Sequence, residues 1–101
     1  MTEVVYNSRY GGFSYGGFSF SKEASRRLIE LGVKGADNDG SRHVCRHDPL
    51  VIQVVRELGH DANGRFANLR IAEVSGKKYL IEEYDGKESV KEPKDIEWVD
   101  V

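Results

Sequence analysis

The chain has 101 residues and a formal net charge of −2, with 15 Lys and Arg against 17 Asp and Glu. Hydrophobic residues make up 39% and charged residues 32% of the sequence, a balance typical of a folded domain and too apolar for a disordered chain. No apolar run reaches the roughly 18 residues that cross a bilayer, and the near-neutral charge argues against nucleic acid as a partner, because such binding depends on neutralising phosphates.

The first half of the sequence predicts one strand and two helices. Residues 2–6 read Thr-Glu-Val-Val-Tyr, and this β-branched and aromatic character predicts a short first strand. Ser21 is a good N-cap and Gly32 a typical C-terminal stop, so we expect a first helix between them. Asp48 followed by Pro49 opens a second helix, which carries a broad apolar face.

The second half predicts a C-terminal β-meander over residues 66–92, because the hydrophobic period changes there to 2. Its strands are expected over 66–74, 77–84 and 87–92, with turns at 75–76 and 85–86. We therefore predict a single α+β domain over residues 1–101, with element order β-α-α-β-β-β and two helices packed on one face of a mainly antiparallel sheet. The second face and the edge strand of that sheet predict a homo-oligomer.

A repeated pentapeptide stands between the first strand and the first helix. The residues Tyr10–Ser14 read Tyr-Gly-Gly-Phe-Ser and recur without change as Tyr15–Ser19. Four glycines within eight residues are costly inside a regular strand or helix, so residues 9–20 are predicted to form a glycine-aromatic loop or a strongly bent strand.

This loop is the candidate ligand site. Glycine amides can approach an anion closely, aromatic faces can stack on a base, and arginines can pair with phosphates. The predicted ligand-binding residues are Arg9, Tyr10, Gly11, Gly12, Phe13, Tyr15, Gly16, Gly17, Phe18 and Arg26. The alternative is structural: one copy of the repeat is a bent strand whose aromatic rings pack into the core, and the other copy bulges outward.

Three blocks of sequence carry a resemblance. They are the Tyr-Gly-Gly-Phe-Ser run, Arg-His-Asp-Pro at 46–49 and Glu-Glu-Tyr-Asp-Gly at 82–86, in that order along most of the chain. The pattern resembles a family of small proteins encoded in phage genomes. The resemblance implies a viral accessory protein and carries over no catalytic residue. The lone Cys45 and an N-terminus without a signal sequence favour the cytoplasm, which for a viral protein is that of the host cell.

These observations predict a phage accessory binding protein that counters host antiviral defence by sequestering a nucleotide signal. It is predicted to be no enzyme, to need no cofactor and to have no membrane partner. A second hypothesis is a protein–protein inhibitor that docks on a host factor through a sheet edge or the surface around Trp98. The two hypotheses differ in whether the partner is a small anionic ligand or a host protein.

A third hypothesis is a metal-dependent enzyme. His43, Cys45 and His47 alternate along the chain, so in an extended segment all three point to one side and offer nitrogen and sulfur ligands for zinc. Their spacing matches no established zinc motif, since structural sites usually join two separated pairs of ligands. The structural alternative is that Asp48 caps the second helix and Cys45 packs as a small apolar residue.

Overall fold

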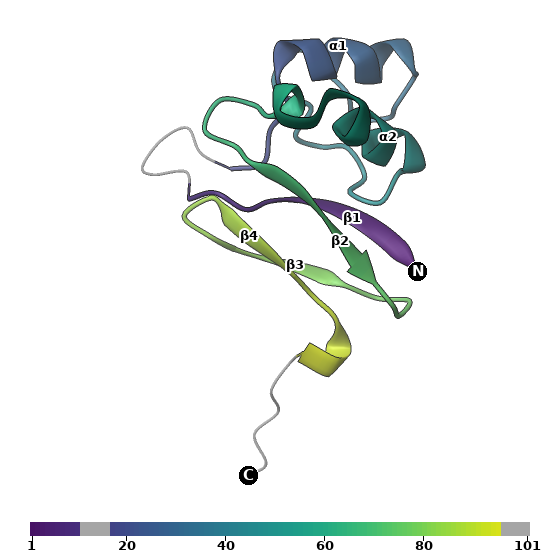
Figure 1. Ribbon diagram of the computed structural model, residues 1–101, viewed down its shortest axis with the longest axis vertical. Coiled ribbons are helices and arrows are strands. Elements are labelled where there is room, and N and C mark those ends of the chain that lie inside the picture. The colour runs from purple at the N-terminus through teal and green to yellow at the C-terminus, as the bar shows by residue number, and fades with distance from the viewer. Residues whose placement is uncertain (11–16, 96–101) are drawn as a thin grey trace.

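The computed structural model describes residues 1–10 and 17–95, and it confirms the α+β class and the predicted order of elements (Figure 1). The strands are β1 (Thr2–Asn7), β2 (Leu69–Val74), β3 (Leu80–Tyr84) and β4 (Lys87–Lys91). The α-helices are α1 (Lys22–Glu30) and α2 (Pro49–Leu58), and two short 3-10 helices are η1 (Gly59–Ala62) and η2 (Pro93–Asp95).

Side-chain caps fix where both α-helices begin, as predicted. The Ser21 hydroxyl accepts a hydrogen bond from the Ala24 amide at 3.1 Å and donates one to the Asp61 carbonyl at 2.6 Å, so it joins α1 to η1. The Asp48 carboxylate accepts from the Leu50 amide at 2.9 Å. Both helices bury an apolar face in one core, to which α2 contributes Val51, Ile52, Val54 and Val55.

The strands form two separate antiparallel pairs. β1 pairs with β2, with Val4 opposite Ala72, and β3 pairs with β4, with Glu82 opposite Ser89. The meander predicted over residues 66–92 is thus present only in its second hairpin, whose Asp85-Gly86 turn has the positive φ angles of a two-residue hairpin. β2 pairs with β1 and not with β3, which begins at Leu80 after a longer connection.

The β1–β2 pair lies between the helices and the β3–β4 hairpin (Figure 1). Successive side chains of β1 therefore pack alternately against the helices and against the hairpin. Val5 belongs to the core beneath the helices, whereas the fully buried Val4 and its neighbour Val74 lie on the other face of the pair. This arrangement explains why a strand of only six residues has almost no exposed apolar surface.

A buried polar network joins the three layers. Arg46, just before α2, donates to both carboxylate oxygens of Glu88 in β4, at 2.7 and 2.9 Å. The same carboxylate accepts from the amide of Asn7 at 2.9 Å. The fully buried Asn7 side chain donates to the carbonyls of Arg9 and Gly86 and accepts from the amide of Asn68. These bonds hold the hairpin against β1 where no strand pairing does so.

Glu92 closes the connection between β2 and β3. Its Oε1 accepts from the amides of Ser75 and Gly76, at 3.0 and 2.9 Å, and from the Ser75 hydroxyl at 3.1 Å. The hydrogen bond from the Gly76 amide is the main cause that lowers the pKa of Glu92, and it outweighs the opposing effect of burial. The turn amides are thus satisfied by a carboxylate and not by a hairpin partner, which agrees with the separation of β2 from β3.

We expect this contact to make stability depend on pH. A carboxylate whose pKa is lowered by folding stabilises the native state above its ordinary pKa of about 4.3, and this contribution is lost as the pH falls through the lowered value. The free energy of unfolding of the wild type should therefore exceed that of Glu92→Gln near neutral pH, and the gap should shrink as the pH falls below the ordinary pKa of a glutamate. Urea denaturation of both proteins across this range checks the prediction, which a gap independent of pH would contradict.

Candidate functional site

The structure places only part of the predicted binding segment. Gly11, Gly12, Phe13, Tyr15 and Gly16 lie outside the described residues, as does Trp98. The placed members are Arg9, Tyr10, Gly17, Phe18 and Arg26, and they do not gather at one site.

Phe18 is a core residue. Its side chain is 6% exposed and packs edge-to-face against Phe20, with 5.2 Å between the ring centroids. The guanidinium of Arg46 lies over the ring, 3.4 Å from its centroid. The ring therefore offers no free face to a ligand, which corrects the expectation for this residue. The structural alternative describes Phe18 better, because the second copy of the repeat supplies a ring to the core.

The remaining members point to three different surfaces. Tyr10 lies edge-to-face against Tyr84 on the hairpin, and the Lys87 ammonium is 4.9 Å from its ring centroid. Arg9 lies on another side, with its guanidinium carbon 5.8 Å from the ring centroid of Phe66. Arg26 is exposed on α1. Of these placed side chains, Arg9 is the one that approaches Phe66, whose ring lines the groove described below.

The repeat can be tested by deletion. Because the two copies are identical, removing residues 10–14 or 15–19 gives the same 96-residue chain, which keeps one Phe-Ser pair in front of Phe20. We expect this chain to fold, with a free energy of unfolding within about 1 kcal/mol of the wild type, because shortening a loop changes its closure entropy little. Thermal unfolding followed by circular dichroism measures the difference, and loss of the cooperative transition would show that both copies are needed.

The end of the glycine-aromatic segment helps to build a groove. Residues 19–21 run extended between two loops: the Phe20 amide donates to the Gly40 carbonyl at 2.8 Å, and the Gly64 amide donates to the Ser19 carbonyl at 2.9 Å. A side chain at position 64 would overlap Ser19, so glycine permits this close approach. The two loops and the start of α1 are thereby held in fixed positions around one hollow.

We call this hollow the basic groove. It has a volume of about 620 Å³ and is lined by Ser19, Phe20, Ser21, Lys22, Asn38, Asp39, Gly40, Arg42, Arg65 and Phe66. Three of these side chains are cationic and one, Asp39, is a carboxylate. The positive end of the α1 dipole also lies here, because α1 begins at Lys22. Cationic side chains and a helix start around one hollow favour an anionic ligand.

Phe66 supplies a flat surface at the groove. Its side chain is 36% exposed, and guanidinium carbons lie 5.8 Å (Arg9) and 5.1 Å (Arg65) from its ring centroid. Its φ of 65° is in the left-handed region, which costs a residue with a Cβ roughly 1–2 kcal/mol; strain of this kind occurs in turns and clusters at ligand sites. The sequence predicts a strand from residue 66, whereas Phe66 lies in the turn before β2; an aromatic residue next to Arg65 is the local signal that could have indicated this surface.

Replacing Phe66 by glycine tests whether this residue contributes to the stability of the fold. Glycine adopts positive φ without strain, and the side chain that is lost is partly exposed, so we expect the midpoint of thermal unfolding to stay the same or rise. Phe66→Leu is the matched control, because it keeps both the Cβ and the strained φ while removing the aromatic ring. A midpoint clearly lower for Phe66→Gly than for Phe66→Leu would show that side-chain packing at this position outweighs the backbone strain.

Cys45, His47 and Tyr79 form a second cluster. The Tyr79 hydroxyl lies 2.6 Å from His47 Nδ1, and burial raises the pKa of Tyr79, so its hydroxyl keeps its proton at neutral pH. Cys45 Sγ is 3.5 Å from both ring nitrogens of His47. A sulfur equidistant from both lies off the ring plane, because in the plane it would clash with ring carbons. The thiol is therefore badly placed to give its proton to the in-plane lone pair of His47.

The metal cluster of the third hypothesis does not assemble among the residues that the structure places. Over 1–10 and 17–95, no group of three His, Cys, Asp or Glu side chains lies close enough to hold a metal ion. The segment 41–47 is a series of turns and not the extended strand that the alternation of His43, Cys45 and His47 assumed, so the side chains do not share one direction.

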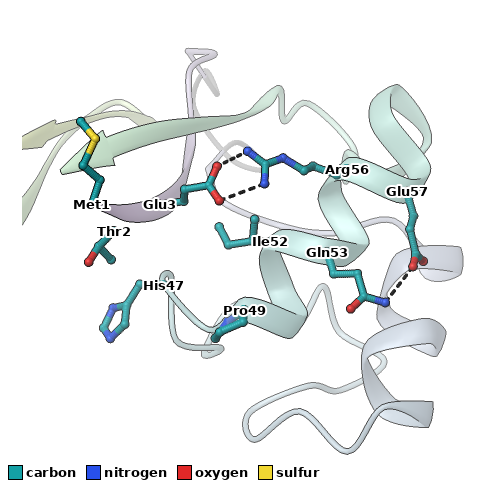
Figure 2. A pocket seen from close by; sticks show the side chains of 9 residues that line it. All are labelled: Met1, Thr2, Glu3, His47, Pro49, Ile52, Gln53, Arg56 and Glu57. Atoms are coloured by element: carbon teal, nitrogen blue, oxygen red, sulfur yellow. Dashed lines mark hydrogen bonds and ion pairs between the residues drawn. The ribbon is translucent and has the colours of Figure 1, made fainter. Parts of the chain in front are cut away.

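A larger groove lies beside α2 and β1, with His47 at one end (Figure 2). Its volume is about 740 Å³. Glu3 and Arg56 form an ion pair along its wall, and Gln53 donates to Glu57 at 2.8 Å (Figure 2). These four polar side chains already bind one another in two pairs. This groove therefore offers a ligand fewer available polar groups than the basic groove does.

Comparisons with protein-family models, with curated proteins and with solved structures find no match to this chain. Within the part of the chain that the structure describes, no helix has the length and apolar character needed to span a bilayer.

Proposed function

We propose that the protein binds a small ligand that carries both phosphate and a flat ring, and that this ligand is a nucleotide held in the basic groove. The observation that carries the proposal is the position of Phe66, a partly exposed aromatic ring on a strained backbone with the guanidinium groups of Arg9 and Arg65 close to it. A strained backbone at a partly exposed aromatic residue favours a role in binding, because such strain clusters at ligand sites.

Each part of the groove has a role in this proposal. Arg42 and Arg65 pair with phosphate oxygens, which guanidinium groups bind in a bidentate manner. The ring of Phe66 stacks on the base, an interaction worth about 1–3 kcal/mol. Asn38 and Asp39 are placed to bond hydroxyl or amino groups of the sugar and base. The binding site thus moves from the repeated segment to its C-terminal end, and of the predicted arginines only Arg9 remains close to it.

The phage resemblance supplies a biological role for such binding. A viral accessory protein that holds a nucleotide signal of host antiviral defence lowers the free concentration of that signal without converting it. This role needs affinity and not catalysis, so it requires no nucleophile or metal. A host-cell cytoplasmic location and assembly into a homo-oligomer stay predictions alongside it.

Calorimetric titration tests the proposal. The full chain is titrated with a panel of cyclic and linear mono- and dinucleotides, with inorganic phosphate and adenosine as controls for charge and for ring. We expect at least one nucleotide to bind with a micromolar or lower Kd and each control to bind far more weakly, because phosphate and base contacts act together. Absence of heat for every nucleotide, or equal affinity for inorganic phosphate alone, would overturn the proposal.

A further inference from the structure

The outer edge of β3 is an unpaired strand edge. Tyr84 and Lys87 flank a two-residue turn and face each other across the hairpin, so the backbone groups of Leu80, Glu82 and Tyr84 point toward β4. Those of Ile81 and Glu83 then point outward. Within the described residues, no hydrogen bond reaches these outward amides and carbonyls.

The outer edges of β1 and β2 are partly capped by hydrogen bonds from other segments of the chain, and β4 lies against β1. On β1, the Val5 amide donates to the Arg46 carbonyl at 2.9 Å and the Asn7 amide to Glu88. On β2, the amides at the two ends of the outer edge donate to side-chain oxygens: Leu69 to Asn63 at 2.7 Å and Ser75 to Glu92 at 3.0 Å. Capped edges resist the addition of another strand. β3 carries no such caps among the residues that the structure places.

The side chains of β3 present an alternating pattern on the exposed face. Leu80 is 42% and Tyr84 is 70% exposed, and Glu82 lies between them on the same face. The neighbouring Glu83 carboxylate accepts from the Gly86 amide at 2.6 Å and so belongs to the hairpin turn. Glu82 is the acid in the middle of this face, flanked by two exposed apolar side chains.

We propose that β3 binds an extended basic segment of a partner protein, which adds as a strand to this edge. Backbone hydrogen bonds to Ile81 and Glu83 supply the affinity. A lysine or arginine of the partner lies opposite Glu82, and apolar residues two positions to either side contact Leu80 and Tyr84. This surface lies on the hairpin and shares no residue with the basic groove, so the proposal does not depend on nucleotide binding.

Charge argues against a second copy of this chain at the same edge. In an antiparallel β3–β3 pair, a residue whose backbone groups point outward lies opposite another such residue. The two-fold axis of the pair therefore passes through residue 81, 82 or 83. A centre at Glu82 or Glu83 places that glutamate opposite itself, and a centre at Ile81 places Leu80 opposite Glu82. A basic segment avoids both the like-charge contact and the apolar–acid mismatch.

The test uses the full ¹⁵N-labelled chain and the synthetic peptide acetyl-Thr-Val-Thr-Lys-Thr-Val-Thr-amide. We expect the amide signals of Ile81 and Glu83 to shift and their exchange with solvent to slow, with smaller changes at Glu82 and Tyr84. The same peptide with Glu for Lys should bind about tenfold more weakly. Glu82→Lys should reverse this preference, while Lys77→Glu, an exposed charge change just before the strand, should not.

Three outcomes would overturn the proposal. They are unchanged Ile81 and Glu83 amides at saturating peptide, equal binding of the two peptides, and a β3–β3 dimer in sedimentation that Glu82→Lys abolishes. The dispersion of the amide spectrum confirms in each case that the variant is folded.

Discussion

Replacing Glu88 by alanine should lower the free energy of unfolding by about 3–5 kcal/mol, because it leaves a largely buried guanidinium without its anion. Arg46 loses two charge-assisted hydrogen bonds, and the Asn7 amide loses its acceptor. For a small domain whose total stability is about 5–15 kcal/mol, this is a large fraction. Urea denaturation followed by circular dichroism measures it.

The double variant Arg46→Met/Glu88→Leu is the control for this prediction. Removing both charges leaves no unpaired ion, so the double variant should lose less stability than Glu88→Ala alone. Glu82→Ala, an exposed carboxylate on the same hairpin, should change stability by less than about 0.5 kcal/mol. A loss below about 1 kcal/mol for Glu88→Ala would show that the network contributes little and that apolar packing alone holds the hairpin.

Reversing the charge of Arg65 should have the largest effect on ligand affinity. Arg65→Glu replaces a cation at the basic groove with an anion and removes one of the guanidiniums beside Phe66. Losing a charge-assisted hydrogen bond to phosphate and adding repulsion should weaken nucleotide binding about a hundredfold. Calorimetric titration with the tightest-binding nucleotide of the panel measures this change.

Arg26→Glu is the matched control, because it makes the same charge change on an exposed face of α1 that does not line the groove. Its affinity should stay within about threefold of the wild type, since exposed charges at a distance are screened by salt. Equal losses for the two variants would mean that overall charge and not the groove determines binding.

The helices were predictable because their signals are local. Ser21, Asp48 and Pro49 act on amides within one turn of themselves, so their roles can be read from spacing alone. The Asp85-Gly86 turn was predictable for the same reason, since two positive φ angles in sequence favour this pair of residues.

Strand partners and buried polar contacts were not predictable, because they join residues far apart in the chain. β2 pairs with β1 across more than sixty residues, and nothing local in Ser75-Gly76 shows that Glu92 will bind its amides. Glu88 lies on the same side of its strand as Val90, which is the only local sign that its carboxylate is buried. Its partner Arg46 could not be identified from spacing.

The candidate site shifted for a related reason. Composition identified the glycine-aromatic segment but could not tell which ring packs inside, and Phe18 is buried because Arg46 and Phe20 cover it. Phe66 was missed because its exposure depends on a left-handed backbone within an otherwise strand-like pattern.

Chemical-shift mapping with a bound nucleotide tests the location of the site most directly. The ¹⁵N-labelled chain is titrated with the nucleotide that gives the strongest calorimetric signal. We predict the largest shifts at the amides of Lys22, Gly40, Arg65 and Phe66, with little change at Tyr84 on the hairpin or at Gln53 beside the other groove. Saturable shifts centred on Tyr84 or Gln53, or none at all, would contradict the account.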